Sequence, residues 1–554
     1  MVMSTKRWMR LFSVLFALVL FASACGSDSD DSADGGDDDD TTTETTQSEV
    51  TVPTGGDDGG EEEPEEEEEP EEVVPASGTL RMVEFSPVTT FDPAGAQAAQ
   101  SLYLYGEYDT LTRQKPDYTL EASLATAWEQ PDPNTWVFTI REDVTFHDGS
   151  PLNGEVVAAN MLYHQAFDGN PNAVTWANVT GVEATGDFEV TVTFSVPQPQ
   201  FALQMSMVMG MMISGEAIAE GRDLTRDPAG SGPWQWSADE SVAGVTEIYN
   251  AIDNPWNPAD QGVERLEVTS VPDNTARLNA LLTGETEIMG TIRDPQVGDA
   301  EDHGGELSAA PNYFPYILVT GRDGAFDEPL ADPKVREAMA LAIDREAYVA
   351  AIHAGRANTD GGVYPSAFVQ FYVPELDETP TFDQERAREL LAEAGYPDGL
   401  TIRAPIMPVI QPHVELVNQM WAAVGINVEQ IQINNGELGP RTRAGDWGVT
   451  WLRDLLYHPA NDLPKFVDVD GPLNPFELDD MKDLSDMLVE AANSTDLAEQ
   501  QGIYAEVEAQ MIERGMLIPL GHASTQAWVA PGVTGAYQGL NMQGPMPYGV
   551  RVEG

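Results

Sequence analysis

The sequence is poor in cysteine, in basic residues and in long apolar runs. Among 554 residues there is one cysteine, Cys25, and 27 Lys and Arg stand against 93 Asp and Glu, a formal net charge of −66. A single cysteine excludes an internal disulfide framework and any cysteine-rich metal cluster. So acidic a surface repels the phosphates of nucleic acids and anionic lipid headgroups, and we therefore expect no nucleic-acid partner.

Histidine is also scarce, and the sequence carries no enzyme motif. Its seven histidines are scattered without an HExxH pair, and there is no phosphate-binding loop of the Walker or dinucleotide type. The stretch "FHDGSP" places His147 before residues 148–151, whose Asp-Gly-Ser-Pro order is typical of a turn. "SGPW" (231–234) is a Gly-Pro turn, because the spacing of a GxSxG nucleophile elbow is absent. We expect a binding protein with no catalytic residue, no metal and no cofactor.

The N-terminus has the pattern of an export signal. Leu11 to Ala24 are 14 almost wholly apolar positions that follow three basic residues. A helix of that length rises about 21 Å, short of the roughly 30 Å hydrocarbon core of a bilayer. Residues 1–24 are therefore predicted to be a signal peptide. The Met-rich "FALQMSMVMGMMISG" (201–215) is interrupted by polar residues and glycine, and it is not a membrane span either.

The lone cysteine directly follows this apolar run. "ASAC" (22–25) resembles a bacterial lipobox, in which small residues precede a cysteine that is lipidated and becomes the new N-terminus. The same Ala-Ser-Ala is also an A-x-A site for ordinary signal peptidase, so both processing routes stay open. The lipobox resemblance implies lipidation of Cys25.

An acidic segment separates Cys25 from the rest of the chain. Between Asp28 and Glu72 there are 22 acidic residues and no basic ones. Such a composition cannot bury enough apolar surface to repay its ordering, so residues 25–77 are predicted to be the lipidated cysteine and a disordered tether. The body that follows still carries about −47, and adaptation to salt and a preference for cationic ligands both explain that charge.

After Pro75 the pattern changes to short strands, turns and helices. "TWVFTI" (135–140) and "FEVTVTF" (188–194) alternate apolar and polar residues, as half-buried strands do. "ADPKVREAMALAIDREAYVAAIHAG" (331–355) predicts a helix capped by Asp332, and a second helix is expected after Asp383, ending at Gly395. A strand over 400–403, a helix around 414–424 and a strand over 426–429 follow. This alternation indicates an α/β domain.

The order of motifs in the body resembles the extracytoplasmic solute-binding proteins of ABC importers, in the peptide/nickel-type class known as family 5. The matching segments, which span some 440 residues in the family's order, are "GTLRMVEFSPVTTFDP" (78–93), "LATAWE" (124–129), "WVFTIREDVTFHDGSPL" (136–152), "PAGSGPW" (228–234), "RLNALLTGETEI" (277–288), "DPKVREAMALAIDRE" (332–346), "LLAEAGYPDG" (390–399) and "IPL" (518–520).

The resemblance implies a two-lobe, hinged periplasmic-binding-protein fold with an extra inserted domain. The first lobe is then expected from residues 78–100, 223–308 and 516–554, the β-rich insert from 101–222, and the second lobe from 309–515. A ligand binds between the lobes, which close around it, and the closed receptor docks on a permease driven by its own ATPases. The receptor is expected to be a monomer on the extracytoplasmic face of the bacterial membrane, attached only through its lipid.

The resemblance also implies ligand-binding residues. In oligopeptide binders of this class a carboxylate in a W-x-x-D segment receives the peptide's α-ammonium group, and "TWLRD" (450–454) places Asp454 there. Arg453 is expected to pair with Asp454 or with a ligand carboxylate, and Trp451 to stack on the ligand or line a pocket. Further expected contacts are Gln97, Ala98 and Ala99, as an extended edge for the ligand backbone, and His522.

Two other interpretations of the body stay open. The first is a receptor of the same fold for another solute, because the few positions before Trp451 lack the basic residue with which some tripeptide binders hold a C-terminal carboxylate, and the same class includes binders of oligosaccharides, nickel chelates, haem and opines. The second interpretation is a secreted hydrolase or adhesin that shares the fold. The absence of nucleophile motifs argues against a hydrolase, and the absence of repeats argues against an adhesin.

Overall fold

The computed structural model describes residues 74–97, 100–378, 381–444, 446–474, 476, 478–539 and 545–553. The chain divides into two compact units, Met1–Glu72 and Val73–Gly554, and the described residues belong to the second. The predicted signal peptide, Cys25 and the tether up to residue 73 lie outside the described residues, as do Ala98 and Ala99. Within the described ranges no helix is both long and apolar enough to cross a membrane.

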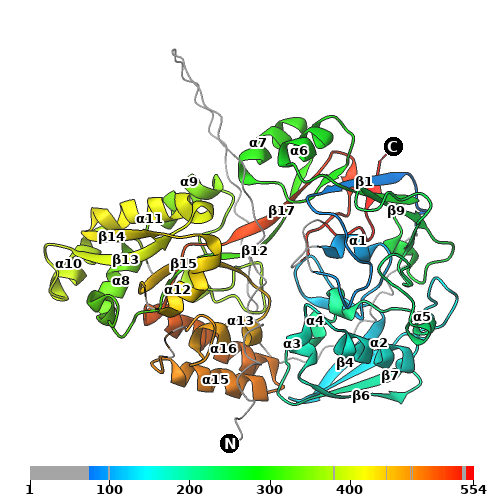
Figure 1. Ribbon diagram of the computed structural model, residues 1–554, viewed down its shortest axis with the longest axis horizontal. Coiled ribbons are helices and arrows are strands. Elements are labelled where there is room, and N and C mark those ends of the chain that lie inside the picture. The colour runs from blue at the N-terminus through cyan, green and yellow to red at the C-terminus, as the bar shows by residue number, and fades with distance from the viewer. Residues whose placement is uncertain are drawn as a thin grey trace, which may run out of the picture. The chain divides into compact units, whose positions relative to one another are not determined.

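A nine-stranded mixed sheet runs through the body, in the order β15-β12-β17-β11-β1-β10-β9-β8, with β16 also paired to β12 (Figure 1). Its longest strand, β12, pairs with β17 through its first half and with β15 and β16 through its second half, so that β12 and β17 join two parts of the sheet. The strands are β1 Thr79–Glu84, β8 Trp234–Trp236, β9 Thr246–Ala251, β10 Arg265–Ser270, β11 Ile288–Met289, β12 Glu306–Val319, β15 Val449–Leu455, β16 Leu517–Pro519 and β17 Ala523–Val529.

The two faces of β1 illustrate how this sheet is buried. Leu80 and Met82 point into one apolar cluster and Val83 into another, as the two-residue period of a strand dictates. β1 is parallel to β10 and β11, and α6 connects those two strands. The helices of this part are α6 Asn274–Leu282 and α7 Asp294–His303, and η3 is Pro258–Asp260.

A separate antiparallel sheet, β4-β5-β7-β6, lies inside the predicted insert. The predicted strand 135–140 is confirmed as β5, and the one over 188–194 as β7, one residue shorter. Trp136, Phe138, Val190 and Val192 alternate into its core. The elements of this region are α1 Ser101–Tyr105, β2 Thr112–Gln114, β3 Leu120–Ala122, β4 Ala125–Asp132, β5 Thr135–Ile140, α2 Gly154–Ala166, α3 Ala173–Trp176, β6 Val179–Gly186, β7 Glu189–Phe194, α4 Phe201–Gln204, η2 Val208–Gly210 and α5 Gly215–Glu220.

The turn expected after His147 is present, and the histidine does not pair with Asp148. Gly149 has φ +86°, and Asp148 accepts hydrogen bonds from the backbone and the hydroxyl of Ser150, an arrangement typical of a turn. His147 Nδ1 lies instead 2.9 Å from Oε1 of Glu107. The "SGPW" turn passes so close to Glu107 that a Cβ on Gly232 would meet its backbone at 2.7 Å.

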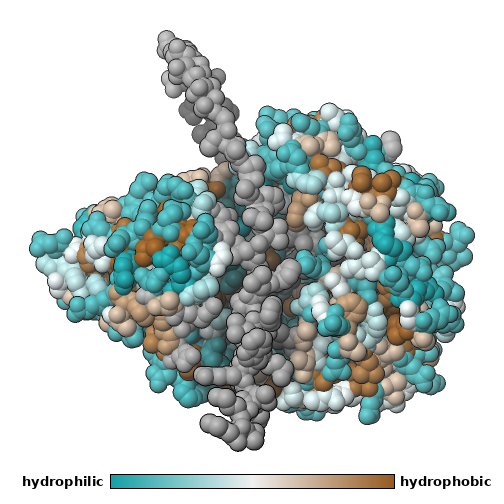
Figure 2. Space-filling model, viewed as in Figure 1, coloured by the Kyte–Doolittle hydropathy of each residue, from teal (hydrophilic) through white to brown (hydrophobic). Residues whose placement is uncertain are grey.

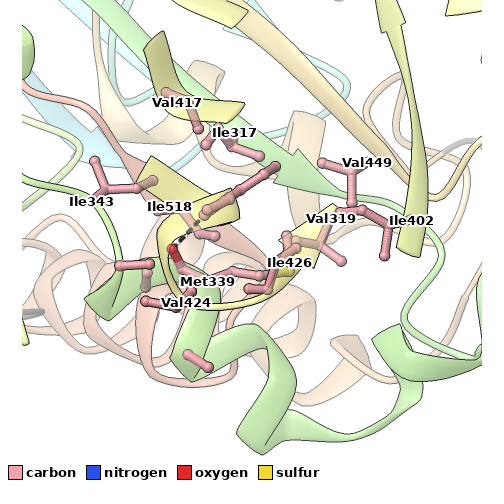
Figure 3. Close-up of a cluster of buried hydrophobic side chains, with 14 of the residues drawn as sticks. Ile317, Val319, Met339, Ile343, Ile402, Val417, Val424, Ile426, Val449 and Ile518 are labelled. Atoms are coloured by element: carbon pink, nitrogen blue, oxygen red, sulfur yellow. Dashed lines mark hydrogen bonds between the residues drawn. The ribbon is translucent and has the colours of Figure 1, made fainter. Parts of the chain in front are cut away.

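An α/β unit forms the core of the predicted second lobe. β13 and β14 are parallel neighbours, and the connecting helix α11 packs against β14. Figure 3 shows the apolar side chains that α8, α11, β12, β13, β14, β15 and β16 bury together, with the indole of Trp421 donating to the Met339 carbonyl at 2.8 Å. The elements are η4 Glu328–Ala331, α8 Pro333–Leu341, α9 Arg345–His353, η5 Pro374–Glu378, α10 Gln384–Glu393, β13 Leu400–Ile406, η6 Pro408–Ile410, α11 Gln411–Ala423, β14 Ile426–Gln432, η7 Asn435–Glu437 and α12 Leu438–Ala444.

One helix prediction in this unit was wrong. The caps at Asp332 and Asp383 are confirmed, since both side chains accept from backbone N–H groups of the following turn. The stretch after Asp332, however, is two helices, because α8 ends at Leu341 and Asp344 caps α9 by accepting from Ala347 N. A second N-capping aspartate competes with helix continuation.

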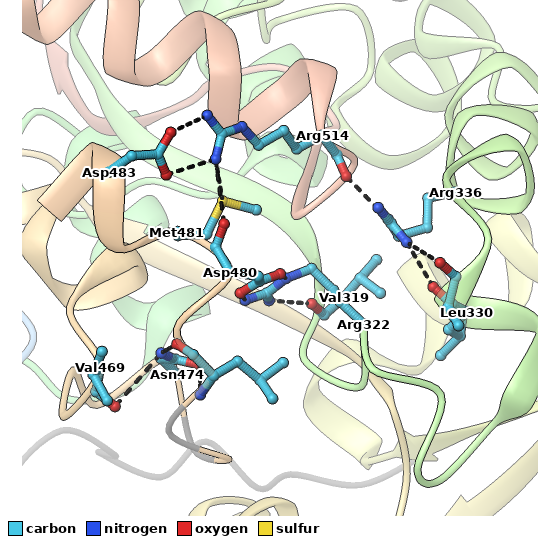
Figure 4. A network of polar contacts seen from close by, with 12 residues as sticks. Val319, Arg322, Leu330, Arg336, Val469, Asn474, Asp480, Met481, Asp483 and Arg514 are labelled. Carbon is cyan, nitrogen blue, oxygen red and sulfur yellow. Dashed lines mark hydrogen bonds and ion pairs between the residues drawn. The ribbon is translucent and has the colours of Figure 1, made fainter.

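Buried arginines tie the remaining helices of this part to β12. Arg322, just after β12, forms a two-pronged ion pair with Asp480 at 2.7 and 2.8 Å, and Arg336 of α8 donates to the carbonyls of Leu330 and Arg514 (Figure 4). These contacts satisfy groups that would be costly to bury alone. The elements here are α13 Pro459–Asp462, α14 Pro464–Val467, α15 Lys482–Asn493, α16 Leu497–Glu513, β18 Val533–Thr534 and β19 Arg551–Val552.

The mixed α/β class predicted from the sequence is confirmed. The face of the body drawn in Figure 2 is mostly hydrophilic, with apolar residues in small separate patches. The small antiparallel sheet lies within residues 101–222, and β13 and β14 lie within 309–515. The proposed lobe boundaries themselves remain a prediction.

Candidate functional site

Asp454, the residue predicted to receive an ammonium group, lies on β15 at the edge of the main sheet. β15 runs antiparallel to β12, and the hydroxyl of Tyr316 on β12 donates to Asp454 Oδ2 at 2.7 Å. Burial raises the pKa of the Asp454 carboxyl above its ordinary value, against the opposing effects of the Tyr316 hydrogen bond and the charge of Lys465. Among the described residues no basic side chain forms an ion pair with Asp454, because Lys465 pairs with Asp462 at 2.9 Å.

Asp462 organises the turn that follows β15. Its side chain is 2% exposed, and Oδ2 accepts from the Tyr364 hydroxyl at 2.9 Å and from the backbone N–H groups of Tyr457 and His458 at 2.8 and 3.1 Å. Its Oδ1 meets the Lys465 ammonium. Asp462 is therefore paired with a cation and bonded at both oxygens, whereas among the described residues Asp454 has a hydroxyl and no ion-pair partner.

Trp451 and Arg453 point to the opposite face of β15. Trp451 is 2% exposed and packs on Trp421 in the apolar core, with 5.6 Å between ring centroids. In this arrangement the Trp451 ring belongs to the core, and its contact with a ligand or a pocket remains a prediction. Arg453 is exposed, and its guanidinium lies over the Tyr313 ring at 5.4 Å. Neighbouring side chains of a strand face opposite ways, so Arg453 does not pair with Asp454.

His522 is a core histidine in this structure. It is fully buried, stacks on Phe314 at 5.1 Å, and its ring nitrogens lie 3.1 Å from Oδ1 of Asn358 and 2.8 Å from the Val363 carbonyl. Burial lowers its pKa to about 4. The ligand contact predicted for His522 would require an exposed edge, which this packing does not provide.

The predicted edge for a ligand backbone is described only at its first residue. Gln97 is exposed, and its carbonyl accepts from Gln100 N at 2.8 Å. Ala98 and Ala99 lie outside the described residues. Their contact with a ligand remains a prediction.

Two cavities lie between the region 101–222 and the region 364–500. The first has a volume of about 230 Å³ and the second about 300 Å³, and four residues line both: Gln200, Leu203, Tyr457 and His458. The second is mainly aromatic and apolar, and Tyr118 stacks on Phe368 at its rim with 5.4 Å between ring centroids.

Tyr457 links these cavities to the carboxylate. Burial raises the pKa of the Tyr457 hydroxyl, and the charges of Asp462 and Asp454 raise it further. Tyr457 lines both cavities and follows Asp454 by three positions along the chain. The structure brings together Asp454 and Tyr316, whereas Trp451 and Arg453 lie on the other face of β15 and His522 lies in the core.

Sequence reasoning missed the cavity residues. Tyr457 follows "TWLRD" by three positions, and residues 203–209 belong to the Met-rich segment that we had weighed only as a membrane span. Runs of methionine adapt to irregular surfaces and recur at binding sites, so the composition carried a usable signal. Within the described residues no group of three or more histidine, cysteine, aspartate or glutamate side chains could hold a metal ion.

Comparison with known proteins gives this site its context. Residues 119–462 match the model of the bacterial extracellular solute-binding proteins, family 5 Middle. The glutathione-binding protein GsiB of Shigella dysenteriae is 26% identical over 83% of this chain and 93% of its own length.

Two solved structures share the fold. HbpA2 from Haemophilus parasuis has a TM-score of 0.76 and 23% identity over 86% of this chain and 100% of its own. DppA from Helicobacter pylori, in complex with peptide STSA, has a TM-score of 0.63 and 20% identity over 87% and 99%. The chain belongs to the bacterial extracellular solute-binding proteins of family 5, two-lobe receptors that bind a solute for an ABC importer.

Proposed function

We propose that this receptor binds peptides through their α-ammonium group and delivers them to an ABC permease. The observation that carries the proposal is Asp454, a half-buried carboxylate that accepts from a tyrosine hydroxyl and has no ion-pair partner among the described residues. Keeping such a charge unpaired is costly, and a ligand ammonium would supply the missing partner. The relatives named above include a glutathione-binding protein and a receptor in complex with a peptide.

The arrangement of strands supports a closing motion around the ligand. β12 carries Tyr316 in its second half, and its first half pairs with β17 in the other part of the sheet. A peptide held by Asp454 on one side and by the region 101–222 on the other would stabilise the closed form, because it contacts both sides only when they are together. The closed receptor would then be the species that docks on the permease.

The proposal includes the anchor predicted from the sequence. A lipid on Cys25 and an acidic tether would hold a monomeric receptor at the extracytoplasmic face of the membrane, near its permease. About fifty flexible residues span roughly 40 Å on average, and self-repulsion of the acidic side chains extends them.

The test measures how Asp454 and a peptide N-terminus depend on each other. Calorimetric titration with tripeptides should show binding that Asp454→Asn weakens by about 2–5 kcal/mol, because the ammonium is left without its counter-charge. N-acetylation of the same peptide should weaken binding to the parent protein equally, and it should add nothing in the variant. Asp398→Asn, at an exposed turn, is the matched control and should bind like the parent.

Two results would count against the proposal. If N-acetylated and free peptides bind the parent equally, the ammonium is not the recognised group. If a sugar or a nickel chelate raises the melting temperature of the protein and peptides do not, the receptor belongs with another solute class of its family. Acidification gives a further check, since peptide affinity should fall as pH drops through the raised pKa of Asp454.

A further inference from the structure

The smaller cavity is built from four separate parts of the chain. They are α1, the stretch 171–175 at the start of α3, the Met-rich segment around α4 and η2, and the turn after β15. The residues that line it are Ser101, Tyr105, Pro171, Asn172, Thr175, Gln200, Leu203, Gln204, Met207, Val208, Met209, Tyr457, His458 and Asn461.

Three oxygen atoms of this lining are buried without a hydrogen-bond partner among the described residues. They are Oγ of Ser101, Oε1 of Gln200 and Oε1 of Gln204. Ser101 is 3% exposed, and the amide nitrogens of the two glutamines are already used, by Gln198 at 3.1 Å and by Thr175 at 3.3 Å. Buried polar atoms are nearly always bonded, and the two carboxamide oxygens can only accept, so their being unbonded at one cavity indicates a ligand that donates.

The lining also carries no charge at neutral pH. Apart from its tyrosines, the lining has one titratable side chain, His458, and burial lowers the pKa of that histidine to about 4. A carboxylate entering this space would lose its hydration without meeting a cation, because no lysine or arginine lines it, whereas an uncharged N–H group would meet the unbonded oxygens. The apolar walls of Leu203, Val208 and Met209 suit the methylenes of a side chain.

We propose that this cavity is a subsite for an uncharged, N–H-donating group of the ligand, such as a side-chain carboxamide, and that it rejects carboxylates. The inference rests on the proposed function, since the ammonium of the same ligand would be held at Asp454. Tyr457 lines the cavity and follows Asp454 by only three positions along the chain, so the two subsites lie near each other. The receptor would thus favour peptides with asparagine or glutamine at one position.

The experiment is a positional scan with C-terminally amidated tripeptides. Trialanine amide is the reference, and glutamine, glutamate or leucine replaces alanine at each position in turn, with affinities measured by calorimetry on the full-length protein. At one position glutamine should bind about tenfold more tightly than both glutamate and leucine, because each of these lacks the N–H donors. The Gln204→Leu variant should lose the preference for glutamine over leucine at that position. Gln130→Leu, a half-buried glutamine on β4 of the same region, is the matched control and should keep it.

The outcomes separate this inference from the proposed function. If trialanine amide binds and no position distinguishes glutamine from glutamate and leucine, the subsite is overturned and the peptide receptor stands. If Gln204→Leu keeps the preference, the cavity is not where the carboxamide binds. If none of the peptides binds, the proposed function fails, and the subsite fails with it.

Discussion

Two joints of the molecule are built differently. The region 101–222 is joined to residues 223–308, predicted to lie in the first lobe, by a buried ion pair between Arg113 and Asp260. Residues 223–308 and 516–554 are joined to the region 309–515 by the pairing of strands β12 and β17 and by an ion pair of Arg356 with Glu301 that is partly in water. Buried pairs are costly to break and exposed pairs contribute little, so we expect the first joint to be rigid and the second to be mobile.

The rigid joint centres on Arg113. Its guanidinium forms two hydrogen bonds of 2.7 Å with Asp260, lies 4.3 Å from the centre of the Tyr548 ring, and is 3.7 Å from Asp109. Arg113 and Asp109 come from the region 101–222, and Asp260 and Tyr548 from the first-lobe segments. A second buried contact crosses the joint between His147 Nε2 and the Gly232 carbonyl, 2.8 Å apart, and Glu107 of the same region as His147 holds its Nδ1 at 2.9 Å.

The ion pair at the mobile joint is more exposed, although His522 is buried there against Asn358 and Val363. Arg356 meets Glu301 of α7 at 3.2 Å, and their side chains are 22% and 55% exposed. His353 lies 3.3 Å from Asp294, also of α7. The rigid joint would carry the region 101–222 along with the first lobe, so that a hinge movement at β12 and β17 opens and closes the cavities beside Tyr457.

The largest effect is expected from breaking the rigid joint at its centre. Arg113→Met leaves Asp260 and Asp109 buried without their cation and should cost about 3–5 kcal/mol of unfolding free energy. Urea denaturation followed by circular dichroism measures it. Arg386→Met removes an exposed ion pair of α10 and should stay within about 0.5 kcal/mol of the parent. Equal losses in the two variants would show that the buried pair does not distinguish this joint.

His147 tests the same joint through pH. Burial alone would lower its pKa, but the Glu107 carboxylate and the Gly232 carbonyl raise it above the ordinary 6.5. The contribution of protonated His147 to the unfolding free energy is therefore fully present below pH 6.5, and it is lost as pH rises through the raised pKa of His147. His147→Gln should cost about 1–3 kcal/mol at pH 6 and less at pH 9, measured by urea denaturation at both values.

His164 of α2 is the control with the opposite sign. It is buried against Trp176 without a carboxylate, and burial lowers its pKa to about 4. The unfolded chain gains a proton at this site as pH falls below 6.5, so the cost of His164→Gln should shrink on acidification. If both variants showed the same pH trend, the Glu107 contact could not be the cause of the pH dependence at His147.

The sequence specified local structure better than it specified the site. The caps at Asp332 and Asp383 and the strand 135–140 depend on near neighbours, and all three were predicted correctly. A family motif predicted Asp454 as a site residue. The face of the sheet to which its side chain points was not predicted, because no strand was predicted there. An odd separation along β15 sends Trp451 and Asp454 to opposite faces.

The cavities could not be predicted, since their walls come from residues far apart in the chain. Ser101, Gln204 and Tyr457 share one lining although up to 356 positions separate them. Local periodicity carries no information on such contacts. The contacts at the two joints could not be predicted either, because nothing near Arg113 in the sequence indicates that Asp260, 147 positions further on, is its partner.

The smallest effect is expected at the mobile joint, and it completes the contrast. Arg356→Met removes the contact with Glu301 and should change the unfolding free energy by less than about 1 kcal/mol, because both side chains remain partly hydrated. Any difference from the parent should vanish in 1 M salt, where charges are screened beyond about 3 Å, whereas the loss in Arg113→Met should persist. A loss at Arg356 as large and as salt-resistant as that at Arg113 would mean that both joints are rigid. The closing of the lobes would then have to come from bending within β12 and β17 alone.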